Sequence, residues 1–173
     1  MKPGVEYLPD SAVDEKLDRE LRDLFTVCFT KPQDIVFRER RYFVVPYAHR
    51  WVIRGERSEI VSHAGVHERL LECGNEQYCA GGIAEVCVHP GFRGRGYVRI
   101  MLAEIHQWLK EEGFVFAVLF GNPRVYESSG YREVSNIYCG VDGNEWKQVP
   151  GMMKELGRTS WPKGEVHVPG GKF

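Results

Sequence analysis

Hydrophobic residues change their spacing along the chain, and each spacing predicts a different element. Over about residues 12–29, apolar side chains recur every three or four positions, which is typical of an amphipathic helix. Ser11 and Asp14 stand three residues apart and resemble a capping box at the start of this helix. Prolines interrupt the following segment, 31–48, and predict irregular structure there.

Strand-like patterns begin near residue 50. Trp51–Arg54 and Glu59–Leu71 are predicted strands, and a turn around Gly55 joins them. The sequence Cys73-Gly74-Asn75-Glu76 is typical of a hairpin turn, and it leads into a predicted strand over 78–88. This part of the chain is therefore expected to form a strand meander.

Helical spacing returns after residue 96 and stops at Gly113, which is placed as a C-terminal cap. One face of this helix carries four apolar residues: Val98, Met101, Ile105 and Trp108. The following run, Phe114–Phe120, is short and continuously apolar, so it predicts a strand that is buried on both faces.

The remaining elements are a short helix over about 122–129 and a strand over 131–139. Residues 140–173 are less regular, with a final strand predicted at Glu165–Pro169. The order of helix, strand meander, helix crossover, central strand, short helix and strand predicts an α/β fold with a mixed sheet. No linker or internal repeat divides the sequence, so we expect a single domain over 1–173.

Composition narrows the range of functions. The chain has 173 residues with 43% hydrophobic and 27% charged residues, an ordinary globular mixture that can bury a sizeable core. The net charge of -1 provides no overall field for nucleic acid or for an anionic membrane. The longest apolar run, Phe114–Phe120, is far too short to span a bilayer, and no signal-peptide pattern opens the sequence. We expect a soluble, cytoplasmic protein without nucleic-acid or membrane partners.

The cysteines and histidines give no pattern typical of a metal site. Five cysteines occur without a CxxC pair, which predicts free thiols in a reducing compartment: Cys28, Cys73, Cys79, Cys87 and Cys139. His63 and His67, four apart in a predicted strand, share one face, but no third ligand is placed nearby. We therefore expect no metal, and pocket or structural roles for these histidines.

The sequence most suggestive of chemistry is Val86-Cys87-Val88-His89-Pro90-Gly91-Phe92-Arg93-Gly94-Arg95-Gly96-Tyr97. Here a strand ends at a proline, and a glycine-rich turn opens an amphipathic helix. Glycines let successive backbone N–H groups point to one spot, and the helix N-terminus adds positive potential there. Arg93 and Arg95 add full charges. A pyrophosphate is the ligand that such a turn suits best.

Other glycine-loop interpretations fit this turn less well. The dinucleotide fingerprint fails because Arg99 occupies the position of its third glycine, and no GKS/T sequence follows as in nucleotide hydrolases. Gly91 and Gly94 match the GxxG clamp of an RNA-binding KH domain, but that clamp joins two helices, whereas here a strand precedes it. A basic surface turn without a ligand stays open at this point.

The chain resembles the GNAT superfamily of N-acetyltransferases at two sites. Their acetyl-CoA signature, Arg/Gln-x-x-Gly-x-Gly/Ala, is matched by Arg93 and Gly96, whereas Val98 departs from it. The second block, Tyr-x-x-x-Gly-Phe/Tyr, is matched by Tyr126-Glu127-Ser128-Ser129-Gly130-Tyr131. The two blocks stand in the right order with a strand between them, and the resemblance covers about 50–135.

The similarity is nearest to the branch that includes aminoglycoside 2'-N-acetyltransferases, through Ser62–Leu102. It implies a mixed, mostly antiparallel sheet flanked by helices, and transfer of an acetyl group from acetyl-CoA directly to a primary amine of a small molecule, aminoglycoside-like amines included. A homodimer would also be in keeping with this family. Two alternatives are a non-catalytic acyl-CoA sensor and an acetyltransferase that acts on a peptide or protein amine.

The resemblance also implies roles for individual residues. Glu85 corresponds to a base on the cofactor strand, acting through water, and Tyr126 to the acid that protonates the leaving thiolate. The remaining implied residues bind the cofactor: Val86, Cys87, Val88, Arg93, Gly94, Arg95, Gly96, Tyr97, Val98 and Asn122. A covalent acyl-cysteine at Cys87 is not expected, because no histidine is placed by spacing to activate it.

Overall fold

A computed structural model describes residues 4–141 and 145–173 of the chain. The helices and strands are β1 Val5–Pro9, α1 Glu15–Cys28, β2 His49–Arg54, β3 Ile60–Cys73, β4 Glu76–Val88, α2 Tyr97–Glu111, β5 Phe116–Leu119, α3 Pro123–Tyr126, β6 Arg132–Val141, β7 Glu145–Glu155 and β8 Val166–Val168. Short 3-10 helices lie between them at Asp10–Ala12, Pro32–Arg38, Pro90–Phe92 and Glu127–Ser129. Internal contacts define two compact units: unit 1 is Met1–Val66 with Ala84–Glu104, and unit 2 is His67–Ile83 with Ile105–Phe173.

The strands pair in the order β1-β2-β3-β4-β5-β7-β6-β8. β4 with β5 and β6 with β8 are parallel pairs, whereas β1 with β2, β2 with β3, β5 with β7 and β6 with β7 are antiparallel. The mixed, mostly antiparallel sheet expected from the resemblance is therefore confirmed. No helix in the described ranges is long and apolar enough to cross a membrane.

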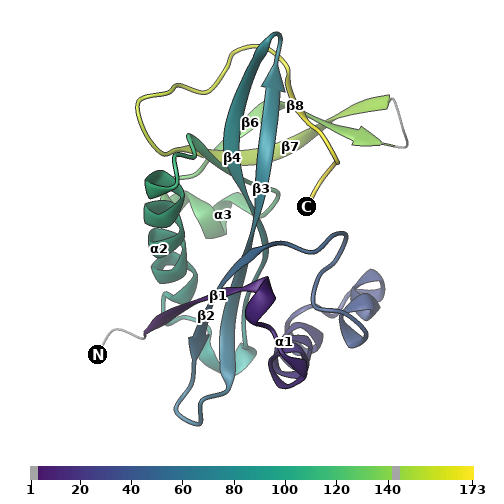
Figure 1. Cartoon of the computed structure of the whole chain (residues 1–173), viewed down its shortest axis with the longest axis vertical. Helices are drawn as coiled ribbons and strands as arrows, with labels where there is room; N and C mark the ends of the chain where they lie inside the picture. The colour runs from purple at the N-terminus through teal and green to yellow at the C-terminus, as the bar shows by residue number, and fades with distance from the viewer. Residues whose placement is uncertain (1–3, 142–144) are drawn as a thin grey trace. The chain divides into compact units, whose positions relative to one another are not determined.

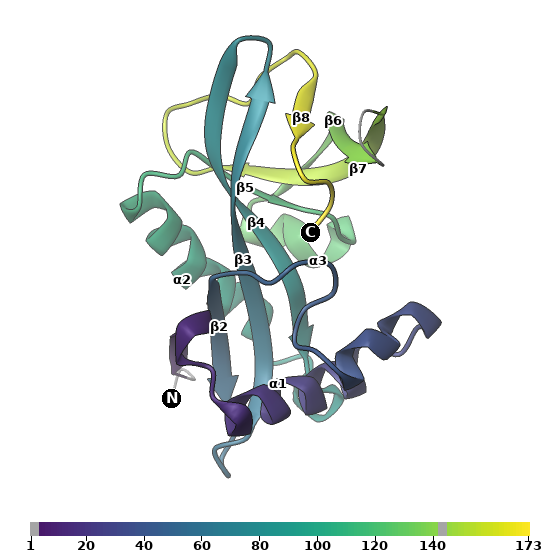
Figure 2. The same ribbon diagram turned by 45° about the vertical axis from the view of Figure 1, so that its right-hand side comes forward.

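In unit 1, β1 and the first part of β3 pair with the two edges of β2 (Figure 1). α1 lies next to strands of this unit in Figure 2 and buries its apolar face against them. The resulting core contains Leu21, Leu24, Phe25, Phe37, Val52, Ile60 and Cys87. The predicted amphipathic helix is thus confirmed, and its burial ties α1 to β2, β3 and β4.

The start of α1 differs from the predicted capping box. Asp14 is the N-cap, and its side chain accepts a hydrogen bond of 2.8 Å from the backbone N–H of Leu17. Ser11 instead lies in the preceding 3-10 helix. Asp14 therefore satisfies one of the N–H groups that a helix leaves unpaired at its start.

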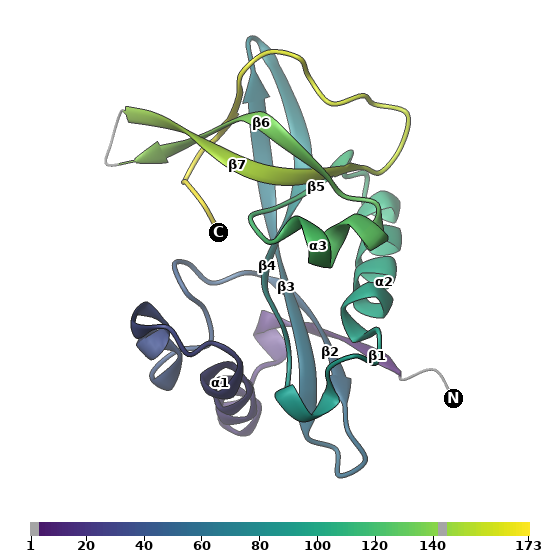
Figure 3. The ribbon, with the colours of Figure 1, turned by 180° about the vertical axis from the view of Figure 1, so that it is seen from behind.

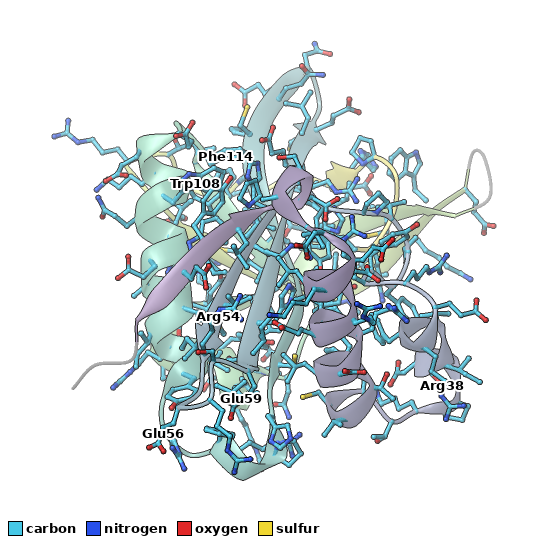
Figure 4. The ribbon with its side chains drawn as sticks, turned by 60° about the horizontal axis from the view of Figure 1, so that its bottom comes forward. Arg38, Arg54, Glu56, Glu59, Trp108 and Phe114 are labelled. Atoms are coloured by element: carbon cyan, nitrogen blue, oxygen red, sulfur yellow. The ribbon has the colours of Figure 1, made fainter. Side chains whose placement is uncertain are left out.

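In unit 2, β5 lies between β4 and β7, and β6 runs along the other edge of β7 (Figure 3). All four residues of β5 are buried, as predicted for a strand covered on both faces. Trp108 on α2 is only partly buried and stacks on Phe114, with 6.0 Å between ring centroids (Figure 4). The core of this unit contains Leu71, Ala80, Phe116, Val118, Ile137, Cys139, Met153, Trp161, Val166 and Val168.

Among the elements of the described residues that were not expected from the sequence are two strands and a 3-10 helix. β1 precedes α1, and β7 occupies eleven residues of a segment predicted to be less regular. Pro32–Arg38 forms a 3-10 helix within the segment predicted to be irregular. The final strand predicted at Glu165–Pro169 is confirmed as β8, and the hairpin turn between β3 and β4 is confirmed at Gly74, which has a φ of 61°.

Candidate functional site

The glycine-rich turn before α2 is open and contains backbone that suits glycine. Gly94 and Gly96 have φ values of 76° and 74°, in the left-handed region where other residues are strained. No heavy atom lies within 4 Å of a Cβ built at either glycine. The turn leads directly into α2, a helix of 15 residues whose first N–H groups have no partner within the helix. This geometry fits a bound pyrophosphate.

The arginines of this turn are exposed and placed by local contacts. The Arg93 side chain donates through Nε to the carbonyl oxygen of Val88 at 3.3 Å. The Arg95 guanidinium lies 4.8 Å from the centre of the Phe92 ring. The next two residues of the predicted loop, Tyr97 and Val98, are half-buried in the first turn of α2.

The predicted cofactor strand ends with one buried and two half-buried residues. Cys87 is buried, and its carbonyl oxygen accepts a hydrogen bond of 2.9 Å from Ser62 Oγ. Burial raises the pKa of the Cys87 thiol well above its usual value, and a hydrogen bond with Cys28 raises it further. Val86 and Val88 on either side are half-buried. A protonated, buried thiol is a poor nucleophile, in keeping with the expectation that Cys87 forms no acyl intermediate.

Glu85 is not an ordinary exposed carboxylate on a strand. Its backbone has a φ of 42°, a left-handed conformation that costs a non-glycine residue about 1–3 kcal/mol. One carboxylate oxygen, Oε1, accepts a hydrogen bond of 3.1 Å from the backbone N–H of Phe43. The other, Oε2, is buried and has no hydrogen-bond partner among the described residues. The side chain is thus held in a specific place rather than solvated.

The surroundings of Glu85 bring its titration close to neutrality. Burial raises the pKa of its carboxyl group to about 7, because the charged form loses its solvation. The hydrogen bond from Phe43 and the positive charge of Arg50 act in the opposite direction and limit this rise. A carboxyl group with this pKa can both accept and release a proton at neutral pH.

A fully buried histidine adjoins the Glu85 backbone. His63 Nδ1 lies 2.8 Å from the carbonyl oxygen of Glu85, and because a carbonyl only accepts, Nδ1 carries the hydrogen. Its Nε2 lies 3.3 Å from the hydroxyl of Tyr47, which also lies 3.1 Å from the carbonyl oxygen of Arg41, so the single hydroxyl hydrogen of Tyr47 serves one of these two acceptors at a time. Burial, together with the charge of Arg50, lowers the pKa of His63 to about 3. The imidazole is therefore neutral.

Arg50 is the largest fully buried side chain in the described chain, with 1% of its surface exposed. Its Nη2 pairs with Asp10, which is also held by Arg41 through hydrogen bonds of 2.7 and 2.9 Å. The Arg50 guanidinium lies 5.1 Å from the centre of the Tyr47 ring. Its Nε and Nη1 are buried and lack hydrogen-bond partners in the described residues. A buried charge with two unpaired donors is unfavourable and points to a functional constraint.

Sequence patterns did not identify Tyr47, Arg50 and His63 as one cluster. Tyr47 fell in the segment predicted to be irregular, and Arg50 lay one residue before a predicted strand. The sequence singles out His63 only as one of two histidines, with His67, that share a face of a predicted strand. The available signal was a polar residue beside apolar residues of a predicted strand, as at Arg50 and His63, and a sequence alone does not reveal that these side chains are buried.

Tyr126 belongs to unit 2 and lies at the end of α3. A Cβ built on Gly121 would lie 2.5 Å from Cε2 of its ring, so the ring occupies the space that a side chain there would fill. The Tyr126 and Tyr131 rings pack edge to face, with 6.0 Å between centroids. Gly130 has a φ of 86° and ends the intervening 3-10 helix. The spacing of the Tyr-x-x-x-Gly-Tyr block thus has a physical basis in this turn.

Two further residues of unit 2 have defined contacts. Asn122, predicted to bind cofactor, is the N-cap of α3, and its Oδ1 accepts a hydrogen bond of 3.1 Å from Arg124. Tyr131 is buried, and its hydroxyl lies 2.8 Å from Nε2 of His106. Burial and the charge of Lys154 lower the pKa of His106 to about 3, so this imidazole is also neutral.

A groove of about 630 Å³ in unit 1 is separate from these residues. It is bordered by β1, α1 and the hairpin between β2 and β3, and Figure 4 shows Arg54 and Glu59 of that hairpin. Arg54 is already paired with Glu6 at 2.8 Å and with Glu20 at 3.2 Å. None of the predicted site residues line this groove, so it does not enter the candidate site.

The predicted residues thus divide between the units: Glu85 to Val98 lie in unit 1, and Asn122 and Tyr126 lie in unit 2.

Among solved structures, a GNAT family N-acetyltransferase from Escherichia coli in complex with CoA matches at 18% identity and a TM-score of 0.64, over 97% of this chain and 92% of that chain. A GNAT family acetyltransferase from Brucella melitensis in complex with acetyl-CoA matches at 16% identity and a TM-score of 0.61, over 94% of each chain.

A GNAT family acetyltransferase from Staphylococcus aureus has 12% identity and a TM-score of 0.57, over 89% of this chain and all of that chain. These similarities show the fold. A search of curated proteins found no match. The family model of the acetyltransferase (GNAT) domain matches residues 12–134, which is well over half of the sequence. The chain therefore belongs to the GNAT acetyltransferase domain family, as the two motifs predicted, and is an acetyl-CoA-dependent N-acetyltransferase.

Proposed function

We propose that the protein transfers the acetyl group of acetyl-CoA directly to a primary amine of a small molecule, with Glu85 as the base and Tyr126 as the acid. The observation that carries the proposal is the state of Glu85. Its carboxylate is partly buried and held by the Phe43 N–H, and its pKa of about 7 suits a general base at neutral pH. An aminoglycoside-like amine is the finer hypothesis for the acceptor.

The proposed reaction has a simple proton balance. A primary amine with a pKa of about 10.4 arrives protonated, and Glu85 removes one proton, directly or through water. The amine nitrogen then attacks the thioester carbonyl, and the carbon–sulfur bond breaks. The thiolate of CoA, with a pKa near that of a free cysteine at about 8.5, receives a proton from Tyr126. The amide nitrogen loses its second proton, which restores the Tyr126 phenol, and Glu85 releases the first proton to solvent, so one proton is released overall.

The cofactor half of the site is proposed from the turn and the strand that precedes it. Arg93 and Arg95, with the open backbone at Gly94 and Gly96, would hold the pyrophosphate of CoA. Main-chain groups of Val86–Val88 would pair with the pantetheine arm and stabilise the oxyanion. One such donor is worth roughly 10²–10³ in rate.

The test is acceptor-dependent release of CoA thiol from acetyl-CoA. The panel contains simple primary amines, aminoglycosides, peptides with a free amino terminus or a lysine, and a reaction without amine. We expect release with small amines. Release with peptides alone would transfer the proposal to a protein or peptide acceptor. Thermal stabilisation by acetyl-CoA without release from any amine would support a sensor and overturn the proposal.

A matched pair of glycine variants tests the cofactor turn. Gly96→Ala should raise the KM for acetyl-CoA, because alanine is strained at a φ of 74° and the turn would have to change. Gly113→Ala introduces similar strain at a φ of 84° at the other end of α2, also with open space around the Cβ. It should leave this KM unchanged. An equal effect of both variants would contradict the assignment of the turn.

A further inference from the structure

The backbone of Glu85 needs an anchor to keep its left-handed conformation. A glutamate does not favour a φ of 42°, and without support it would relax to ordinary strand geometry. Relaxation would turn the side chain, because the direction of the Cα–Cβ bond follows the backbone. Glu85 Oε1 is held by the Phe43 N–H at 3.1 Å, but that contact fixes only the end of the side chain.

His63 supplies an anchor on the main chain itself. Its Nδ1–H donates to the carbonyl oxygen of Glu85 at 2.8 Å, which restrains the peptide next to the strained residue. The His63 side chain is completely buried and packs edge to face with Phe25, with ring centroids 4.7 Å apart. The donor is therefore held by packing as well as by its hydrogen bond.

Tyr47 orients this imidazole from its other side. Its hydroxyl lies 3.3 Å from His63 Nε2, which can accept because Nδ1 carries the hydrogen, and Nε2 shares the single hydroxyl hydrogen of Tyr47 with the carbonyl oxygen of Arg41 at 3.1 Å. The Tyr47 ring occupies space left by Gly65, where a Cβ would lie 2.6 Å from Cε2 of that ring. Glycine at 65 thus allows tyrosine to reach the histidine.

We propose that His63, oriented by Tyr47, is a positioning residue that holds the backbone of Glu85 so that its carboxylate is presented to the acceptor amine. This inference rests on the proposed function, because it assumes that Glu85 is the base. His63 itself moves no proton in the reaction: its neutral imidazole donates to one fixed carbonyl, and its other ring nitrogen faces the Tyr47 hydroxyl.

The charged and titratable groups around His63 and Glu85 come from several elements of unit 1. They are Asp10, Arg41, Tyr47, Arg50 and Cys87. Arg50 lowers the pKa of Glu85 by its charge, whereas His63 acts on the position of Glu85. If the His63 anchor is lost, Glu85 can move toward solvent, and its pKa should fall from about 7 toward its ordinary value.

Two amide substitutions separate the two ends of the histidine. In His63→Asn, the side-chain nitrogen takes the place of Nδ1 and can still donate to the Glu85 carbonyl. In His63→Gln, the amide reaches the place of Nε2 and meets Tyr47, but the donor to Glu85 is lost. We expect His63→Gln to lower kcat by about 10²-fold, the scale of a misplaced reacting group, with the KM for acetyl-CoA unchanged. His63→Asn should keep most of the activity.

The pH profile gives a second readout. In His63→Gln, the acidic limb of kcat should shift to lower pH than in the wild type and in His63→Asn. Tyr47→Phe removes only the hydroxyl and should produce a smaller change in the same direction, which keeps the proposal testable if a His63 variant does not fold. His106, a half-buried neutral histidine whose ring also lies against a tyrosine hydroxyl, provides the control: its Asn and Gln variants should not differ in kcat.

The outcomes separate this inference from the function on which it rests. Equal activity of His63→Asn and His63→Gln, with an inactive Glu85→Gln, would overturn the positioning role alone. A fully active Glu85→Gln would overturn the proposed base and with it this inference. Loss in His63→Gln with retention in His63→Asn and a shifted pH profile would support both.

Discussion

Each unit of the molecule places a neutral histidine against a tyrosine hydroxyl, but His63 is fully buried and His106 is half-buried, and the two pairs differ in what surrounds them. His63 lies 3.3 Å from the Tyr47 hydroxyl in unit 1, and His106 lies 2.8 Å from the Tyr131 hydroxyl in unit 2. In both, burial lowers the pKa of the histidine to about 3. Similar chemistry is therefore used twice, once beside Arg50 and once beside Lys154.

The pair in unit 1 adjoins groups that weaken the fold. Arg50 is buried with two unpaired donors, Glu85 has a buried oxygen without a partner among the described residues, and its backbone is strained. In unit 2, Tyr131 lies beside the Tyr126 ring. The causes that lower the pKa of His106 are burial and the charge of Lys154, and no carboxylate is among them. Unfavourable features gathered in one place are typical of a functional site, where stability is given up for chemistry.

The largest expected effect follows from removing the two proposed catalytic groups separately. Glu85→Gln should lower kcat by about 10²–10⁴-fold, the usual contribution of a general base. Tyr126→Phe should cost nearer 10²-fold, because a thiolate is a good leaving group and needs less help. Thiol release at saturating acetyl-CoA measures both variants.

Binding provides the control for these two variants. Neither substitution alters the turn at Gly94–Gly96, so thermal stabilisation by acetyl-CoA should match that of the wild type. If Tyr126→Phe is the more damaging change, the contrast drawn between the two units is reversed. If either variant fails to bind acetyl-CoA, its loss of activity is not evidence for an acid or base.

A second expected effect is the pH dependence of the contribution from Glu85. Only the ionised carboxylate accepts a proton, and its pKa is about 7. Below this pH, the ratio of wild-type to Glu85→Gln kcat/KM should fall by about tenfold per pH unit, and above it the ratio should level off. Using the ratio cancels the titration of the acceptor amine. A ratio that is constant between pH 5.5 and about 8 would show that Glu85 is not the titrating base.

Local patterns predicted the cofactor half of the molecule better than its buried polar cluster. The glycines of the turn and the buried strand β5 follow from local sequence, and the structure has both. The predicted apolar face of α2 is met only in part: Met101 and Ile105 are buried, whereas Val98 and Trp108 are half-buried and Leu102 and Leu109 are buried instead. Arg50 could not be predicted, because arginine is rarely buried and its partner Asp10 lies 40 positions away. The φ of Glu85 could not be predicted either, because its anchors come from distant segments.

The strand β7 shows the same limit in the fold. Its sequence contains Pro150 and Gly151, both unfavourable within strands, and its first residues are exposed. It forms a strand because β5 and β6 pair with it from both sides. Glu85 and Tyr126 as catalytic residues came from the resemblance to the GNAT family, not from local patterns, and these roles stay predictions.

The third expected effect concerns stability in acid, where the two units should respond differently. Histidine binds a proton near pH 6.5 in the unfolded chain but only near pH 3 at His106, so stability falls as the pH drops below 6.5. Between pH 6.5 and 4.5 this loss amounts to up to about 2.7 kcal/mol. His106→Gln, which keeps a polar side chain but does not titrate, should remove that loss.

In unit 1, the loss of stability in acid that His63 causes is offset by Glu85. Its carboxyl group binds a proton near pH 7 in the folded chain and near 4.5 when unfolded, so stability rises as the pH falls through this window, by up to about 3.4 kcal/mol. Glu85→Gln should therefore stabilise the protein at pH 8 and lose more stability in acid than the wild type. Urea unfolding at pH 8 and pH 4.5 measures the free energy of unfolding of each variant. If this free energy changes equally between the two pH values for His106→Gln and Glu85→Gln, both expectations are contradicted.

The smallest expected effect separates stability from function within unit 1. Asp14→Ala removes the N-cap of α1 and should lower the free energy of unfolding by about 1 kcal/mol. Ser11→Ala, at the position that the sequence pattern favoured, should change it by less than about 0.5 kcal/mol, because its side chain is exposed and caps no helix. Urea unfolding compares the two variants. Neither should change kcat, because the hydrogen bond of the N-cap joins Asp14 to Leu17 and does not involve Glu85. A drop in kcat for Asp14→Ala as large as that for His63→Gln would mean that general loosening of unit 1, rather than loss of one hydrogen bond, displaces Glu85.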